Sequence, residues 1–300
     1  MSDTTLELRE VGGPSALGGG RRRALDLLLL IAINEFRRAY LGTALGYLWS
    51  LIRPLMLFAV LLVVFTQAFD LGEHVEHYPV LLLVFTQAFD LGDRVRQYPV
   101  LLLFNIVLFG FFQEVTTQAV GSIVSHESVV RKTQFPRLVI PLAVVLTGLF
   151  NLAVNLVVVF GFILVAGVHP MWTWALLPLV IAALTVLTTA VSMIVSALNP
   201  RFRDTGIIWA VTVTALFYAT PVLYPLEIVP GRIGQLLALN PLAPLFELAR
   251  KWVIDPSAPS PAVAAGGSVW LLIPAAIFVA VCILAVWVFN REAPRIAEEL

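Results

Sequence analysis

The side chains that could carry out chemistry form no catalytic pattern in this sequence. Gly is nowhere followed by Lys, so no Walker-type phosphate loop is present, and the H-E-x-x-H, C-x-x-C, D-x-D and G-x-S-x-G patterns are absent as well. The four histidines fall between the long apolar stretches, and the single cysteine, Cys282, lies inside one. The sequence therefore predicts no catalytic residue, no metal site and no cofactor on this chain.

Several polar side chains lie inside the apolar stretches. They are Asn105, Gln113, Glu114, Thr116, Thr117 and Gln118 in one stretch, and Asn151 and Asn155 in the next. Polar groups inside a membrane are costly, and they usually face a partner or a water-filled path. For Glu114, an interhelical hydrogen bond or a position near the membrane surface is as well supported as a role in such a path.

The overall composition places the chain in a membrane. Of its 300 residues, 59% are apolar and only 13% are charged, whereas about a quarter of the residues of a soluble domain are charged. Nineteen basic and nineteen acidic residues cancel, so no basic excess attracts nucleic acid. The sequence therefore predicts a membrane protein that does not bind nucleic acid.

The stretches with few charges predict an all-α membrane protein with six transmembrane helices. A helix needs about 20 apolar residues to cross roughly 30 Å of hydrocarbon. The predicted spans are 46–69, 98–123, 138–165, 173–198, 205–226 and 268–289. Together they form a transmembrane domain at 46–289.

The two ends of the chain are predicted to lie outside the membrane core. Residues 1–20 are expected to form a flexible cytoplasmic N-terminus, and residues 290–300 a cytoplasmic tail. The segment 21–45 has an apolar centre that is too short to span and is bracketed by charges, which favours an amphipathic helix in the membrane interface. The alternative is a signal peptide, but no A-x-A cleavage site follows the apolar residues.

The distribution of positive charge predicts the orientation of the spans. With the N-terminus inside, fourteen of the nineteen Lys and Arg residues fall in cytoplasmic segments. The short segments at 126–137 and 199–204 carry this asymmetry most clearly. The positive-inside rule therefore places both termini in the cytoplasm.

A twenty-residue segment occurs twice in tandem. The copies at 61–80 and 81–100 share fifteen identical positions. One interpretation is a paired sugar or cation site that uses Asp70, His74, His77 and Asp90. The favoured interpretation is a duplication tolerated in a loop outside the membrane. The apolar run within it is short for a span, and a crossing there would weaken the charge asymmetry, so it is expected to re-enter or to lie in the interface.

Residues 227–267 are predicted to form a bent, partly re-entrant segment outside the cytoplasm, before the last span. The prolines between residues 220 and 253 are Pro221, Pro225, Pro230, Pro241 and Pro244. Proline breaks a continuous helix, and irregular backbone at membrane depth is tolerated only against protein or a cavity. This arrangement suits a lid over an export path.

Four segments occur in the order typical of one transporter family. FRRAYLGTALGYLWSLIRPLM at 36–56 resembles the R-x-x-Y-x-G-S-x-L-G-x-x-W-x-x-x-x-P signature of ABC-2 type permeases that export polysaccharides and teichoic acids, with Thr43 in place of Ser. ESVVRKTQFPRLVIPLA at 127–143 and ALNPRFRD at 197–204 resemble their cytoplasmic loops, and the proline-rich segment at 220–253 resembles their extracytoplasmic segment. The resemblance covers most of 36–289, and the tandem repeat is the main departure from the family pattern.

The resemblance implies a membrane subunit of an ATP-driven exporter that moves a lipid-linked polysaccharide or teichoic acid across a bacterial inner membrane. It further implies two copies of the chain working with two ATPase subunits, which would bind ATP and Mg²⁺. The helix at 126–137 would then be a coupling helix seated on the ATPase. The residues expected to take part in coupling are Arg37, Arg38, Tyr40, Arg131, Lys132, Phe135, Pro136 and Arg137. From the residues alone, these cations and the tyrosine also suit the lipid headgroups and the positive-inside rule.

Aromatic side chains supply candidates for the translocation path, because sugar rings present C–H faces that stack on aromatic rings. The predicted path residues are Tyr47, Trp49, Arg53, Phe104, Phe109, Phe112, Glu114, Tyr218 and Tyr224. The wider aromatic set also contains Phe58, Phe111, Trp209 and Phe217. The alternative is that these rings face lipid or form the aromatic belts common to membrane proteins.

Three other functions compete with glycan export. The first is ABC-2 export of a small amphipathic drug or lipid. The second is a membrane-embedded glycosyl or acyl transferase, which is disfavoured because no carboxylate pair, metal ligand set or His-based centre is evident. The third is a membrane scaffold, which would not explain the proline-broken helices. A neighbouring gene for a Walker-type ATPase would separate the transporters from the other two.

Overall fold

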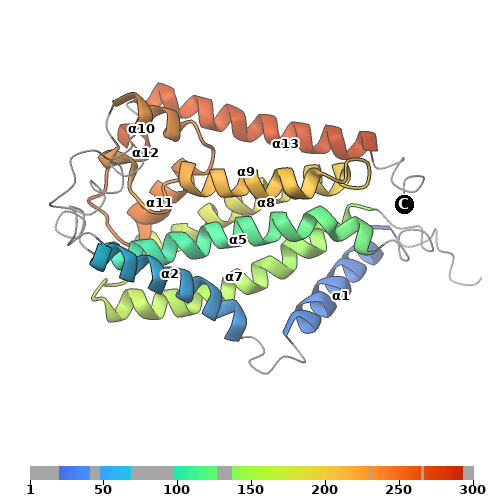
Figure 1. The fold of residues 1–300 in the computed structure, drawn as a ribbon, viewed down its shortest axis with the longest axis horizontal. Coiled ribbons are helices and arrows are strands. Elements are labelled where there is room, and N and C mark those ends of the chain that lie inside the picture. Colours follow the sequence, from blue (N-terminus) through green and yellow to red (C-terminus); the bar gives the residue numbers. More distant parts are fainter. Residues whose placement is uncertain are drawn as a thin grey trace, which may run out of the picture.

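The structure, a computed structural model, describes residues 20–40, 48–68, 97–126, 137–229, 231–264 and 267–292. Within these ranges it is all-helical and contains no β-strand, which confirms the predicted fold class. The longer helices are α1 (Gly20–Tyr40), α2 (Leu48–Ala68), α5 (Tyr98–Ser125), α7 (Val139–Val165), α8 (Leu177–Leu198), α9 (Thr205–Ala219) and α13 (Leu272–Glu292). Figure 1 shows α5, α7, α8, α9 and α13 running along the long axis of the molecule. The tandem repeat lies largely outside the described residues.

Four helices in the described part of the chain are long and apolar enough to cross a membrane. They cover Tyr98–Ser125, Val139–Val165, Trp172–Leu198 and Val269–Glu292. Two shorter apolar helical stretches, Leu51–Leu61 and Thr205–Ala219, occupy the other two positions where spans are predicted. The structure therefore supports at least a four-span helical protein, and the count of six stays a prediction.

Helix α5 forms the centre of the bundle. It contacts α2, α7, α8 and α9, and its residues from Val100 to Phe109 are all buried. Apolar side chains on every side of a helix require neighbours on every side, and α5 carries Leu, Val, Ile or Phe around its whole circumference. Helix α13, by contrast, packs mainly on α8 and exposes most of its apolar surface.

Helix α9 is shorter than the predicted span at 205–226, because it ends at Ala219. Thr220 has φ −98° and ψ 143°, an extended conformation. Two effects of Pro221 explain this end: proline disfavours a helical conformation in the residue before it, and it has no N–H to continue the helix. The apolar residues after Ala219 therefore form a buried turn instead of a further helical turn.

Side chains of α5 hold this turn against the bundle. The Asn105 Nδ2 donates to the carbonyl oxygens of Pro221 and Val222 at 3.1 and 3.3 Å, and the Tyr98 hydroxyl donates to the Leu223 carbonyl at 2.5 Å. These bonds satisfy carbonyl groups that the broken helix leaves without helical partners. The turn after α9 is thus fixed to the first half of α5.

Short helices follow the turn and gather at one end of the bundle (Figure 1). The helices that follow the turn are η3 (Leu226–Ile228), α10 (Gly231–Ala238), α11 (Ala243–Val253) and α12 (Pro261–Ala264). Two further short helices lead into long ones: η2 (Trp172–Leu176) precedes α8, and η4 (Ser268–Leu271) precedes α13. A buried ion cluster ties two of them together. Arg250 of α11 lies 2.8 Å from the Glu227 carboxylate of η3, and Glu247 accepts a hydrogen bond from the Leu226 N–H at 2.9 Å.

Helix α1 lies at the opposite end of the molecule and packs against α7 (Figure 1). The Thr147 hydroxyl of α7 donates to the Ala32 carbonyl at 3.2 Å, and the Phe36 and Phe150 rings meet edge to face with centroids 6.0 Å apart. The His126 Nε2, at the end of α5, lies 3.4 Å from the Glu35 carboxylate. Helix α1 therefore docks where α5 ends and α7 begins.

Candidate functional site

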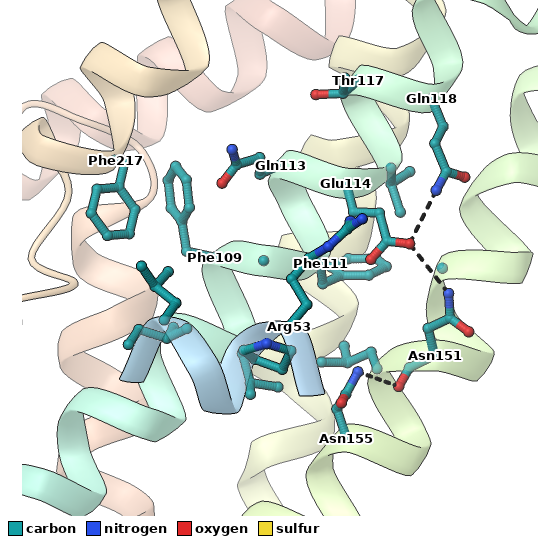
Figure 2. Close-up of a pocket in the computed structure, with 18 residues that line it drawn as sticks. Arg53, Phe109, Phe111, Gln113, Glu114, Thr117, Gln118, Asn151, Asn155 and Phe217 are labelled. Atoms are coloured by element: carbon teal, nitrogen blue, oxygen red, sulfur yellow. Dashed lines mark hydrogen bonds between the residues drawn. The ribbon is translucent and has the colours of Figure 1, made fainter. Parts of the chain in front are cut away.

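A cavity of about 640 Å³ opens between α2, α5 and α7, with Phe217 of α9 at its edge (Figure 2). Its volume falls within the range of about 300–1,000 Å³ typical of ligand sites. Pro54 lies inside α2 next to this cavity, and proline removes one backbone hydrogen bond from a helix. The cavity is thus bordered by a helix that lacks one backbone hydrogen bond at Pro54.

One side of the cavity is polar and built from residues four apart on two helices. Gln118 Nε2 donates to Glu114 Oε1 at 3.0 Å within α5, and Asn151 Nδ2 of α7 reaches the same oxygen at 3.5 Å. Asn155 Nδ2 donates to the Asn151 carbonyl at 3.0 Å. Residues at i and i+4 share one helix face, so both helices present their polar groups to the same space (Figure 2).

Two of these side chains keep unused hydrogen-bonding capacity. The Oδ1 atoms of Asn151 and Asn155 are buried and have no hydrogen-bond partner among the described residues. Asn151 is 5% exposed. An unpaired buried acceptor costs about 1–3 kcal/mol, so a donor from a bound molecule or water would stabilise this side of the cavity.

Arg53 approaches the polar side from α2. Figure 2 shows its side chain pointing toward the Glu114 carboxylate, and the two groups attract each other electrostatically. Arg53 and Glu114 are the only charged residues among the described residues that line the cavity. The lining therefore pairs one positive with one negative charge.

The other side of the cavity is aromatic. The Phe109 and Phe217 rings lie edge to face with centroids 5.2 Å apart, and both line the cavity. Phe109 is almost fully buried, and it also contacts the ring of Phe112 at 5.9 Å. Phe217, packed against this buried ring, offers an apolar surface opposite the amides.

The structure brings only some of the predicted path residues to this cavity. Arg53, Phe109 and Glu114 line it. Phe104, Phe112 and Tyr224 are instead buried in the core, and Tyr218 is 49% exposed on α9. Tyr47 lies outside the described residues, as does the side chain of Trp49.

Residues beyond the predicted path set also line the cavity. They are Gln113, Thr117, Gln118, Asn151, Asn155 and Phe217, together with apolar neighbours. The signal for the amides was their presence inside apolar stretches, with Asn151 and Asn155 four residues apart. The sequence analysis placed Phe217 only in the wider aromatic set and chose its neighbour Tyr218 for the path, whereas Phe217 lines the cavity.

Most of the residues predicted to contact an ATPase fall outside the described part of the chain. Arg131, Lys132, Phe135 and Pro136 lie there, and so do the side chains of Arg38 and Tyr40. Arg37 is exposed on α1, and Arg137 is half-buried in the turn before α7. Along the chain, the segment 127–136 connects the end of α5 to the turn before α7.

Tyr224 of the buried turn makes a hydrogen bond back to the end of α9. Its side chain is buried, and its hydroxyl donates to the Tyr218 carbonyl at 2.7 Å. This bond closes the turn.

Comparison with known proteins identifies similar sequences. The sequence profile described as "ABC-2 type transporter" matches residues 26–253. The O-antigen export system permease protein RfbA of Klebsiella pneumoniae is 29% identical over 223 residues, which cover 74% of this chain and 77% of that protein. The protein of the same name from Myxococcus xanthus is 26% identical over 222 residues, which cover 73% of this chain and 77% of that protein.

Proposed function

Because the chain belongs to the ABC-2 type transporter family, we propose that it is the membrane subunit of an ATP-driven exporter of a lipid-linked polysaccharide. The related permeases from Klebsiella and Myxococcus carry the name of O-antigen export proteins, which supports a polysaccharide as the cargo. The sequence-based alternative of a teichoic acid has no such support from these relatives. We place the protein in the bacterial inner membrane with six spans and both termini in the cytoplasm.

The observation that carries this proposal is the two-sided cavity between α2, α5 and α7. Amide groups offer both donors and acceptors to sugar hydroxyls, and Asn151 has an acceptor without a partner among the described residues. On the other side, the Phe217 ring, packed against the buried ring of Phe109, suits the C–H face of a sugar. Small amphipathic drugs or lipids would use the apolar surface but would leave the amide groups unpaired.

Energy for export is proposed to come from a separate ATPase subunit that binds ATP and Mg²⁺. The absence of a phosphate loop from the sequence supports this division of labour. The segment 126–137, with Arg37, Arg38 and Tyr40 of α1 and Arg137 of the following turn, is the proposed contact surface. Its support is that α1 docks beside the end of α5 and the start of α7, so movement of the segment would reach three helices. Two copies of the chain are proposed to share the path.

Deletion and complementation in the producing cell test the proposal. Cells that lack this gene should accumulate lipid-linked glycan inside and lose it from their surface, and the wild-type gene should restore export only when the ATPase is active. An Asn151→Leu variant should insert normally but export less glycan. The matched control is Phe162→Ala, which changes an exposed side chain of α7 away from the cavity. Normal surface glycan in the deletion strain, or full export by Asn151→Leu, contradicts the proposal.

A further inference from the structure

The charge of the cavity lining restricts the kind of glycan that fits. Among the described lining residues, Arg53 carries the only positive charge and Glu114 the only negative charge. Arg53 points toward Glu114 (Figure 2). The other polar lining groups are uncharged amides and a hydroxyl, namely Gln113, Thr117, Gln118, Asn151 and Asn155. The described lining is therefore electrically neutral.

A polyanionic chain would be poorly accommodated in such a lining. An anion moved out of water needs a compensating cation or several hydrogen-bond donors. The one available cation already faces a carboxylate, so a phosphate or carboxylate on the substrate that approached Arg53 would also meet Glu114. Like charges brought close together repel each other.

An uncharged glycan rich in hydroxyl groups is not repelled by the Glu114 carboxylate. Each sugar hydroxyl can donate and accept, as each amide can. The Asn151 and Asn155 Oδ1 atoms can accept from hydroxyls, and Phe217, backed by the buried Phe109 ring, lies opposite to contact the sugar ring. The available groups thus match a neutral glycan on both sides of the cavity.

We propose that the Arg53–Glu114 pair makes the cavity selective for uncharged glycan segments over polyanionic ones. This inference rests on the proposed export function and adds the substrate class. Glu114 is the discriminating residue: it neutralises Arg53 and repels anionic groups. Arg53 in turn prevents Glu114 from lying in the cavity as an uncompensated charge.

The variant Glu114→Gln isolates the charge of Glu114. Glutamine has nearly the same shape, and its Oε1 can still accept from Gln118 and Asn151. The lining then carries the uncompensated charge of Arg53, so the affinity for a polyanion relative to that for a neutral glycan should rise by about tenfold or more. Arg53→Gln provides a second, independent variant, and it should weaken polyanion binding further.

The test measures binding to the purified full chain in lipid nanodiscs. The probes are a fluorescently labelled neutral glucose oligosaccharide and a glycerol-phosphate oligomer of equal length, and the readout is fluorescence anisotropy at low and high salt. Asp204→Asn is the matched control, because it removes an exposed carboxylate at the start of α9 that does not line the cavity. Elution as a single species confirms that each variant is folded.

The inference predicts that wild-type protein binds the neutral probe at least tenfold more tightly than the phosphate probe, and that Glu114→Gln, but not Asp204→Asn, removes most of this difference. Equal binding of the two probes, or an unchanged ratio in Glu114→Gln, overturns the charge selectivity and leaves the export function standing. Binding of neither probe contradicts the assignment of the cavity as a glycan site and therefore counts against the proposed function as well.

Discussion

Asn105 in the first half of helix α5 donates a hydrogen bond to the carbonyl oxygen of Pro221, 116 residues later in the chain. Pro221 is the residue that ends α9 early, and Asn105 partners the carbonyl exposed by that break. The bond therefore joins the most buried helix to the segment that leads to the short helices at one end of the bundle. This relationship explains why a polar side chain is only 3% exposed in the core.

Replacement of this asparagine should destabilise the protein without affecting the cavity lining. Asn105→Leu removes the donor to Pro221 and Val222 inside the core, and leaving such groups unpaired costs about 1–3 kcal/mol. The melting temperature in detergent should fall. Asn290→Leu, on the exposed face of α13, is the control and should melt like the wild type. An unchanged melting temperature for Asn105→Leu would show that the turn is held by other contacts.

The buried Arg250 should be essential for the short helices. Its guanidinium is 2.8 Å from Glu227 and 3.7 Å from both Glu247 and Asp255. Arg250→Met leaves three carboxylates without their shared cation, and breaking a buried ion pair on one side costs about 3–5 kcal/mol. Thermal unfolding should show a large loss of stability, whereas Arg232→Met, on the exposed side of α10, should show almost none. Similar melting of the two variants would contradict the structural role of the cluster.

Glu247 makes stability depend on pH in this region. Burial raises the pKa of its carboxyl, and the nearby Glu227 adds to the effect, while the Leu226 N–H and Arg250 oppose it. A carboxyl with a raised pKa stabilises the fold fully below its ordinary pKa of about 4.3, and this contribution is lost as the pH rises through the raised value.

Glu247→Gln should therefore flatten the pH dependence. Glutamine keeps an oxygen that can accept from the Leu226 N–H but cannot ionise. Melting curves between pH 4 and pH 8 should show that the variant gains relative to the wild type as the pH rises. Parallel pH profiles for the two proteins would show that ionisation of Glu247 does not limit stability.

The segment 126–137 should couple the chain to its ATPase mainly through Phe135. A buried aromatic anchor carries more binding energy than charges at the rim of an interface. Phe135→Ala should therefore reduce both co-purification with the ATPase and glycan export more than Lys132→Ala does. If the segment only fixes the topology, Phe135→Ala will leave both unchanged as long as the charges remain.

Several helices were predictable because a long apolar stretch in a membrane must satisfy its backbone hydrogen bonds internally, which it does as a helix. The span predicted at 98–123 corresponds to α5 at Tyr98–Ser125, and the span predicted at 138–165 corresponds to α7 at Val139–Val165. The end of α9 was missed because apolar residues continue past Pro221, so hydropathy alone extends the helix. The proline itself was the better signal.

The cavity was only partly predictable, for a reason that lies in α5. This helix is apolar around its whole circumference, so the sequence does not tell which of its rings faces the cavity. Phe104 and Phe109 are both almost fully buried, but only Phe109, five residues later, borders the cavity. Intramembrane amides give a clearer signal, because Asn151 and Asn155 must face something polar wherever α7 is placed.

The central claim is that glycan passes along the cavity between α2, α5, α7 and α9, and photo-cross-linking at Phe217 tests it most directly. Phe217 is replaced by p-benzoyl-phenylalanine in exporting cells, and Trp287, which is 55% exposed on α13, receives the same replacement as a control. Irradiation during export should give a glycan adduct at position 217, only when the ATPase is active, and none at position 287. Export that continues without any adduct at 217, or equal adducts at both positions, would contradict the account.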